Sequence, residues 1–183
     1  AEANSVASRA LSDPDPQVQA NIAMQLRGRG IPEALAWLLE LLESNYEVVR
    51  KAARESLSEF TFNRYLTAFD LMDEEDQRIT GNLVQKIDPQ TIPLLRDEIN
   101  SPIRTRRLRG LAVAQAIGAV GVLEADIEEM TNDADHIVRS EAVAALTHKN
   151  TPSAEPPFVD PETAKQMLQD QLRRALQSLY DLP

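Results

Sequence analysis

The fold is decided by the stretch NDADHIVRSEAVAAL, which spans residues 132–146. An aspartate-rich turn leads into a helix whose apolar side chains Val138, Ala142 and Leu146 are four residues apart. Because an α-helix has 3.6 residues per turn, this spacing places the three side chains on one face. The sequence therefore predicts a helix with one buried stripe.

The same pattern recurs earlier in the chain. Val49, Ala53 and Leu57 repeat the spacing, and Arg50 follows Val49 as Arg139 follows Val138. A further copy comes after Asp13, with its apolar residues at Val18, Ile22 and Leu26. Steps of 30 residues from Val49 reach Ile79 and then Arg109. The equivalent positions of the five repeats, which we call their phases, are therefore expected at residues 18, 49, 79, about 109 and 138.

Other helices are expected between these copies. Leu or Ile recurs on helical spacing in residues 32–42, 65–72, 91–99 and 122–130. Each repeat is therefore predicted to be a helix, a turn and a second helix, and an isolated pair would leave its apolar stripes exposed. The predicted fold class is all-α, an α-α superhelix of about five helix pairs of roughly 30 residues each, plus a C-terminal helix.

These residues resemble the short, phycobilisome-lyase type of HEAT repeat. Its first helix opens like Ile31-Pro32-Glu33-Ala34-Leu35, and its second opens as Asp-x-x-x-x-Val-Arg. The resemblance covers residues 13–149 and implies a solenoid with the first helices outside and the second helices lining a concave face. It also implies that Asp and Arg cross-link successive turns, as Asp133 and Arg139 would, whereas Arg50 faces Ser44 in the second repeat.

Prolines mark the end of the repeat array. Residues 150–161 contain four prolines and cannot continue a helix. We therefore predict a repeat array over residues 1–149, a Pro-rich linker over 150–160 and an amphipathic helix over 161–183. The final helix, with Asp160 as its N-cap, either caps the last repeat or binds a partner, and it is a candidate for oligomerisation.

Composition narrows the classes of function. The chain has no cysteine, which excludes disulfides and thiolate zinc sites, and no apolar run approaches the length needed to span a bilayer. We expect a soluble chain, either cytoplasmic or a domain of a larger protein. The net charge of −10 argues against indiscriminate coating of nucleic acid, although it leaves a local basic face open.

Charge is divided between the two kinds of helix. The first helices with their turns hold 16 acidic and 2 basic residues, whereas the second-helix segments hold 13 basic and 5 acidic residues. A basic concave face would steer an acidic protein surface, helix or peptide towards it. Ten residues are the predicted partner-binding set: Arg50, Lys51, Arg54, Arg78, Lys86, Arg104, Arg106, Arg107, Arg109 and Arg139. The alternative interpretation is that some of these side chains have only a structural role, linking repeats or facing solvent.

No enzymatic motif is present. Deoxyhypusine hydroxylases need repeated His-Glu pairs as iron ligands, whereas here His136 precedes Ile137 and His148 precedes Lys149. The only tryptophan, Trp37, is expected to pack rather than hold a flipped base. We predict a non-catalytic protein-binding scaffold without cofactor or metal; phosphate contacts to nucleic acid through the same arginines, and a bilin-lyase-like enzyme, are the alternatives.

Overall fold

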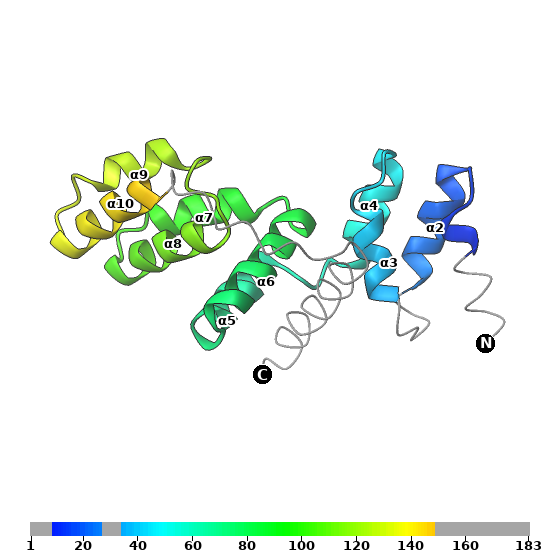
Figure 1. The fold of residues 1–183 in the computed structure, drawn as a ribbon, viewed down its shortest axis with the longest axis horizontal. Coiled ribbons are helices and arrows are strands. Elements are labelled where there is room, and N and C mark those ends of the chain that lie inside the picture. Colours follow the sequence, from blue (N-terminus) through cyan, green and yellow to red (C-terminus); the bar gives the residue numbers. More distant parts are fainter. Residues whose placement is uncertain (1–8, 27–33, 149–183) are drawn as a thin grey trace, which may run out of the picture. The chain divides into compact units, whose positions relative to one another are not determined.

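Residues 9–26 and 34–148 are described by the structure, a computed structural model of the chain. Every regular element in these residues is a helix, so the predicted all-α class is confirmed (Figure 1). The elements are α2 (Pro16–Leu26), α3 (Ala34–Leu41), α4 (Glu47–Ser56), α5 (Phe62–Ala68), the 3-10 helix η2 (Phe69–Leu71), α6 (Glu74–Ile87), α7 (Thr91–Ile99), α8 (Arg104–Ala116), α9 (Glu124–Met130) and α10 (His136–His148). The predicted Pro-rich linker and C-terminal helix lie outside the described residues.

The predicted first helices all have counterparts. They are α3, α5 with η2, α7 and α9, and α7 has the predicted bounds. Helix α5 begins three residues before the predicted start, because Thr61 acts as its N-cap and accepts a 3.4 Å hydrogen bond from the backbone N–H of Arg64. A threonine followed by Phe62 and, three residues later, Tyr65 was the signal for this earlier start.

The chain forms two compact units, and each has its own core. Of the described residues, the first unit comprises 9–26, 34–60 and 86–88, and the second comprises 61–85 and 89–148. In the first unit, Leu26, Leu38 and Leu57 are at most 1% exposed. The buried hydroxyl of Ser56 on α4 donates a 2.9 Å hydrogen bond to the carbonyl oxygen of Ala23 on α2. The two second helices of this unit are thus joined by packing and by a buried polar contact.

An aromatic cluster anchors α5 and α6 in the second unit. The Tyr65 ring is fully buried and lies edge-on to the Phe69 ring, with 5.7 Å between ring centroids. Its hydroxyl donates a 2.8 Å hydrogen bond to the carbonyl oxygen of Gln77, and burial raises the pKa of Tyr65. Gly81 permits the close approach here, because an added Cβ would lie 2.2 Å from Cγ2 of Ile117 and 2.5 Å from the Tyr65 hydroxyl.

One contact recurs in each second helix and fixes the register of the repeats. Near the start of the helix, a long polar side chain donates to a backbone carbonyl oxygen of the preceding turn, which satisfies an acceptor that the turn would otherwise leave to water. The contacts are Gln19 to Asp13 (2.6 Å), Arg50 to Ser44 (2.5 Å), Gln77 to Phe69 (2.8 Å) and Met72 (3.3 Å), Arg107 to Ser101 (3.0 Å), and Arg139 to Asp133 (2.6 Å). We call these five residues the turn-holding side chains.

This register corrects two of the predicted phases. The turn-holding side chains Gln77 and Arg107 place the third and fourth repeats at 76 and 106 rather than 79 and about 109. The burial pattern agrees, because Thr80 and Val84 on α6 and Gly110 and Ala114 on α8 occupy the buried places of Ala53 and Leu57 on α4. The prediction was wrong because strict 30-residue steps were applied to repeats of unequal length.

Candidate functional site

Three of the ten predicted partner-binding residues are turn-holding side chains. Arg50 and Arg139 each donate to the carbonyl oxygen six residues before them, and Arg139 also reaches the carbonyl oxygen of Ala134 at 3.0 Å. Arg107 donates to Ser101 and Pro102 in the same way. The expectation that Arg139 and Asp133 are linked is met through the Asp133 backbone. The Ser44 carbonyl serves Arg50 equally well, because the contact needs no carboxylate.

Arg107 also joins two repeats. Its Nη2 donates a 3.1 Å hydrogen bond to Oδ1 of Asp133, and its Nε lies 2.8 Å from Oδ2 of the same carboxylate. Both side chains are largely buried, at 16% and 12% exposed. The contact joins α8 to the turn that precedes α10. The Arg107 guanidinium group therefore contacts backbone carbonyl oxygens of its own turn and the carboxylate of the next repeat.

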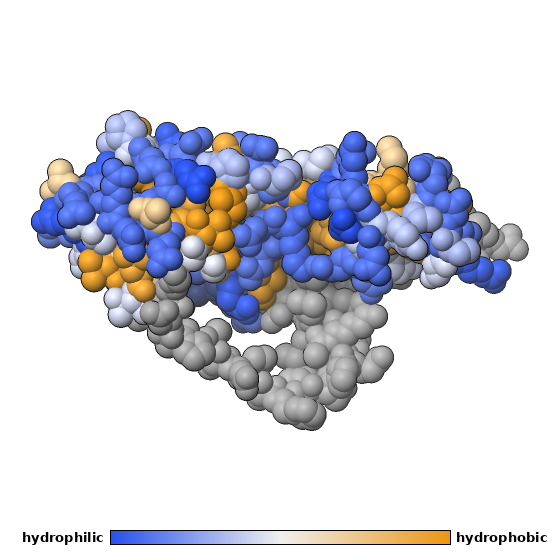
Figure 2. Space-filling view, turned by 90° about the horizontal axis from the view of Figure 1, so that it is seen from above, coloured by the Kyte–Doolittle hydropathy of each residue, from blue (hydrophilic) through white to orange (hydrophobic). Residues whose placement is uncertain are grey.

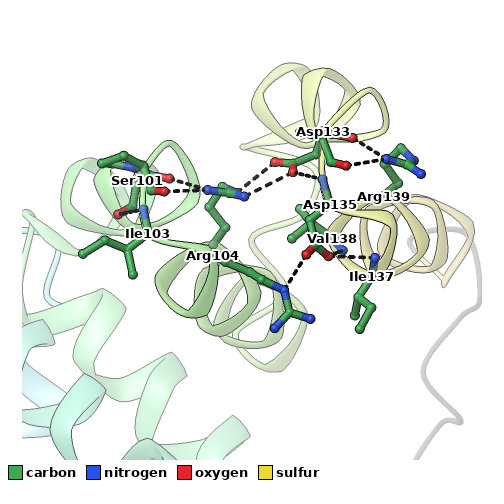
Figure 3. A network of polar contacts seen from close by, with 11 residues as sticks. Ser101, Ile103, Arg104, Asp133, Asp135, Ile137, Val138 and Arg139 are labelled. Carbon is green, nitrogen blue, oxygen red and sulfur yellow. Dashed lines mark hydrogen bonds and ion pairs between the residues drawn. The ribbon is translucent and has the colours of Figure 1, made fainter.

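Arg104 makes a second link to the same turn. Its Nε lies 2.7 Å from Oδ2 of Asp135, whose Oδ1 accepts hydrogen bonds from the backbone N–H groups of Ile137 and Val138 (Figure 3). Desolvation alone would raise the pKa of Asp135, but these backbone donors and Arg104 hold it below its usual value. Asp135 is thus both the N-cap of α10 and the acceptor for Arg104, whose side chain remains 44% exposed.

Arg106 and Arg109 pair with acids from first helices. The Nε of Arg106 lies 3.0 and 3.1 Å from the two carboxylate oxygens of Glu98, a residue of α7 that is 7% exposed. This hydrogen bonding raises the pKa of Arg106. Arg109 Nη2 lies 2.7 Å from Oδ2 of Asp70 at η2, and both of these side chains are substantially exposed. The Glu98 pair is therefore the more buried, and the Asp70 pair is open to competition from solvent.

The four predicted partner-binding residues of the first unit are paired as well. Glu47 accepts hydrogen bonds from Arg50 and from Arg54, and the bond from Arg50 is the main reason that the pKa of Glu47 is lowered. Lys51 lies 4.0 Å from Glu55. Lys86 lies near the end of α6, in the part of that helix that belongs to the first unit. It pairs with Glu43 and lowers the pKa of the Glu43 carboxyl. All of these are solvent-facing contacts, which are individually weak.

Arg78 differs from the other nine residues. It is exposed on α6, and its side chain makes no hydrogen bond or ion pair with any residue of 9–26 and 34–148. The ten residues thus divide into turn holders, residues in ion pairs within or between helices, and one cation whose side chain is unpaired. Sequence reasoning missed Glu98, Asp70, Asp133 and Asp135 because each lies on a different helix or turn from the arginine it pairs with. The Asp-x-Asp pair 133 and 135, about one repeat beyond Arg104 and Arg107, was the available signal.

The described residues hold neither a metal-binding cluster nor a membrane-spanning helix. They contain no group of three or more His, Asp or Glu residues arranged to hold a metal ion. Across the same residues, no helix is long and apolar enough to cross a membrane. Hydrophilic side chains dominate the face of the described residues seen in Figure 2.

Comparison with known proteins identifies the repeat. The profile of the HEAT repeats matches residues 3–112, which include four of the five turn-holding side chains. No curated protein matches the chain at a significant level. HEAT repeats generally mediate protein–protein interactions, and the family is typically non-enzymatic. Together with the helix pairs and their repeated turn contacts, this match shows that the chain belongs to the HEAT-repeat family.

Proposed function

We propose that this chain is a protein-binding scaffold that takes an acidic peptide or helix on the exposed face of its second helices α6 and α8. The observation that carries the proposal is Arg78, an exposed cation without a partner among the described residues. An unpaired arginine gains a charge-assisted hydrogen bond from a partner carboxylate without first losing one.

Arg104 and Arg109 extend this cationic face on α8. By the register of the turn-holding side chains, Leu108 on α8 is equivalent to Arg78 on α6, so Arg109 lies next to the matching position. The side chains of Arg104 and Arg109 remain 44% and 41% exposed. Because exposed ion pairs contribute only about 0–1 kcal/mol, a partner carboxylate can compete for both arginines.

The residues that accompany these arginines are compatible with a docked chain. Asn82 on α6 and Ala112 and Gln115 on α8 are exposed and uncharged. Because none of these three residues is an acid, they would not repel an acidic partner. Their small or polar side chains would also permit close approach. Arg50, Arg107 and Arg139 are removed from the proposed contact set because they hold turns.

Fluorescence anisotropy tests the proposal with a labelled 20-residue helical peptide of Glu, Leu and Ala. Arg78→Glu should weaken binding about fivefold, because an attraction becomes a repulsion. Arg9→Glu, the same charge change at an exposed residue of the first unit, is the matched control and should have less than about half that effect. Absence of binding, or equal loss in both variants, would contradict the proposal.

Binding of a single-stranded DNA of 20 nucleotides, measured in the same way, distinguishes a nucleic-acid partner from a protein partner. Phosphate binding releases counterions, so DNA affinity should fall steeply between about 50 and 200 mM salt. Tighter binding of the DNA than of the peptide, with that steep salt dependence and the same sensitivity to Arg78→Glu, would replace the protein partner by a nucleic acid.

A further inference from the structure

The last described helix, α10, leaves exposed a face whose equivalent is buried in the two preceding repeats. In the second unit, the residue four places after the turn-holding side chain is Gly81 on α6, Leu111 on α8 and Val143 on α10. Gly81 lies against Ile117 of the next repeat, and Leu111 is 1% exposed. Val143 is 53% exposed. The position that is buried in repeats three and four is therefore open in repeat five.

A polar contact is missing at the same place. Arg107 holds its own turn and also pairs with Asp133 of the following repeat. Arg139, its equivalent on α10, holds its own turn through Nη1. Among the described residues, no acid occupies the place that Asp133 takes beside Arg107. Within residues 9–26 and 34–148, this face of α10 thus has neither an apolar nor an acidic neighbour.

We propose that residues 161–180 of this chain cover the α10 face that carries Val143 and Arg139. The chain continues for 35 residues after His148, and its later part has Ala164, Leu168, Leu172 and Leu176 at four-residue intervals. This spacing forms one apolar stripe if the segment is helical. Such a stripe would bury Val143, as the equivalent Leu111 is buried in the preceding repeat.

Charge and reach support this occupant. Glu162 and Asp170 lie within the segment and Asp160 directly precedes it, so the segment brings acids that can pair with Arg139. Twelve residues, 149–160, separate α10 from the segment. When extended, they span up to about 40 Å, which is several helix diameters, so every side of α10 is within reach. The proposal is independent of the acidic-partner proposal, which concerns α6 and α8.

Cysteine cross-linking in the full chain tests this proposal directly, because the sequence has no cysteine. Val143→Cys is combined in turn with Leu168→Cys, Leu172→Cys and Leu176→Cys, and each protein is oxidised at low concentration. We expect at least one pair to form an intramolecular disulfide in a monomer, as seen by non-reducing electrophoresis and intact mass. Val122→Cys, at a residue 62% exposed before α9, is the matched control and should stay reduced with the same partners.

Each alternative result overturns the proposal. Absence of an intramolecular disulfide from all three pairs would show that the segment lies elsewhere. Equal cross-linking to Val122→Cys would show a segment without a fixed site. Disulfides between two chains would identify a second copy as the occupant.

A double-mutant cycle gives a readout that does not depend on cysteine chemistry. Val143→Asp and Leu172→Asp should each lower the unfolding midpoint in urea, and the double variant should lose clearly less than the sum, because the two residues share one contact. Strictly additive losses would overturn the proposal even if both variants fold.

Discussion

Arg107 Nε lies 2.8 Å from Asp133 Oδ2, so one side chain joins the fourth repeat to the fifth while it also holds its own turn. A guanidinium group has five N–H donors in a fixed plane, and this geometry lets Arg107 serve a carboxylate and two backbone carbonyls together. Glutamine has only two N–H donors on one amide nitrogen, so Gln19 and Gln77 can hold a turn but are poorly suited to do both.

The first prediction concerns that shared contact. Arg107→Gln should lower the free energy of unfolding by about 2 kcal/mol, because it leaves the carboxylate of Asp133 largely buried without its cation. The exposed Arg78→Gln should change it by less than about 0.5 kcal/mol. Urea unfolding followed by circular dichroism measures both. Equal effects would show that the Arg107 contact contributes nothing beyond surface charge.

The second prediction concerns the packing of α6. Gly81→Ala should destabilise the fold by about 2–3 kcal/mol, because the added methyl group meets Ile117 and the Tyr65 hydroxyl at distances shorter than any relaxed contact. Asn82→Ala, at an exposed site on the same helix, is the control. Thermal unfolding of the two variants is sufficient. A Gly81→Ala protein as stable as the control would mean that α6 can move away from α8 at little cost.

The third prediction uses an N-cap that lacks a capping side chain. Ile103 precedes α8 with extended backbone, its side chain makes no cap hydrogen bond, and it is 52% exposed. Ile103→Ser should stabilise the fold by about 1 kcal/mol, because its hydroxyl can accept from a free N–H of the first turn. Ile103→Ala is the control for loss of the apolar side chain. Equal stability of the Ser and Ala variants would refute the capping argument.

The fourth prediction concerns pH. Burial alone would raise the pKa of Asp126, but hydrogen bonds from Asn100 and Arg96 lower it below its ordinary value of 3.8. A carboxyl whose pKa is lowered by folding stabilises the protein above its unfolded-state pKa, and that contribution is lost as pH falls through the folded-state pKa.

Asp126→Asn should therefore be less stable than the natural chain at pH 7, and the difference should shrink as pH falls below about 4. Glu129→Gln, on the exposed side of the same helix, is the control and should show little difference at pH 7. Urea midpoints at a series of pH values provide the measurement. A difference between Asp126→Asn and the natural chain that stays constant down to pH 2 would contradict the assignment.

The sequence predicted the helices well because their signals are local. The apolar spacing around Val138 and the turn before it are contained within one helix and its cap. The register of α6 and α8 was harder to predict, since Thr80 and Gly110 stand where Ala53 stands in α4 and weaken the apolar pattern. The turn-holding contact resolves the register because it depends on reach and not on hydrophobicity.

The candidate site was less predictable than the fold. Counting charges by helix found where the cations are, but Glu98, Asp70 and Asp133 reach them from other helices of the folded chain. Ion pairing between repeats is a tertiary property, so periodicity within one helix cannot reveal it. Arg78 stands apart only after those pairs are known.

The pairs that Arg104 and Arg107 make with Asp135 and Asp133 have a consequence for partial unfolding. In a linear array of repeats, the coupling between neighbouring repeats determines how often the end repeat unfolds while the rest stays folded. Two arginines from one helix hold the turn ahead of α10, so α10 cannot detach without breaking both contacts. Native-state hydrogen exchange should therefore show α8 and α10 opening as one cooperative block.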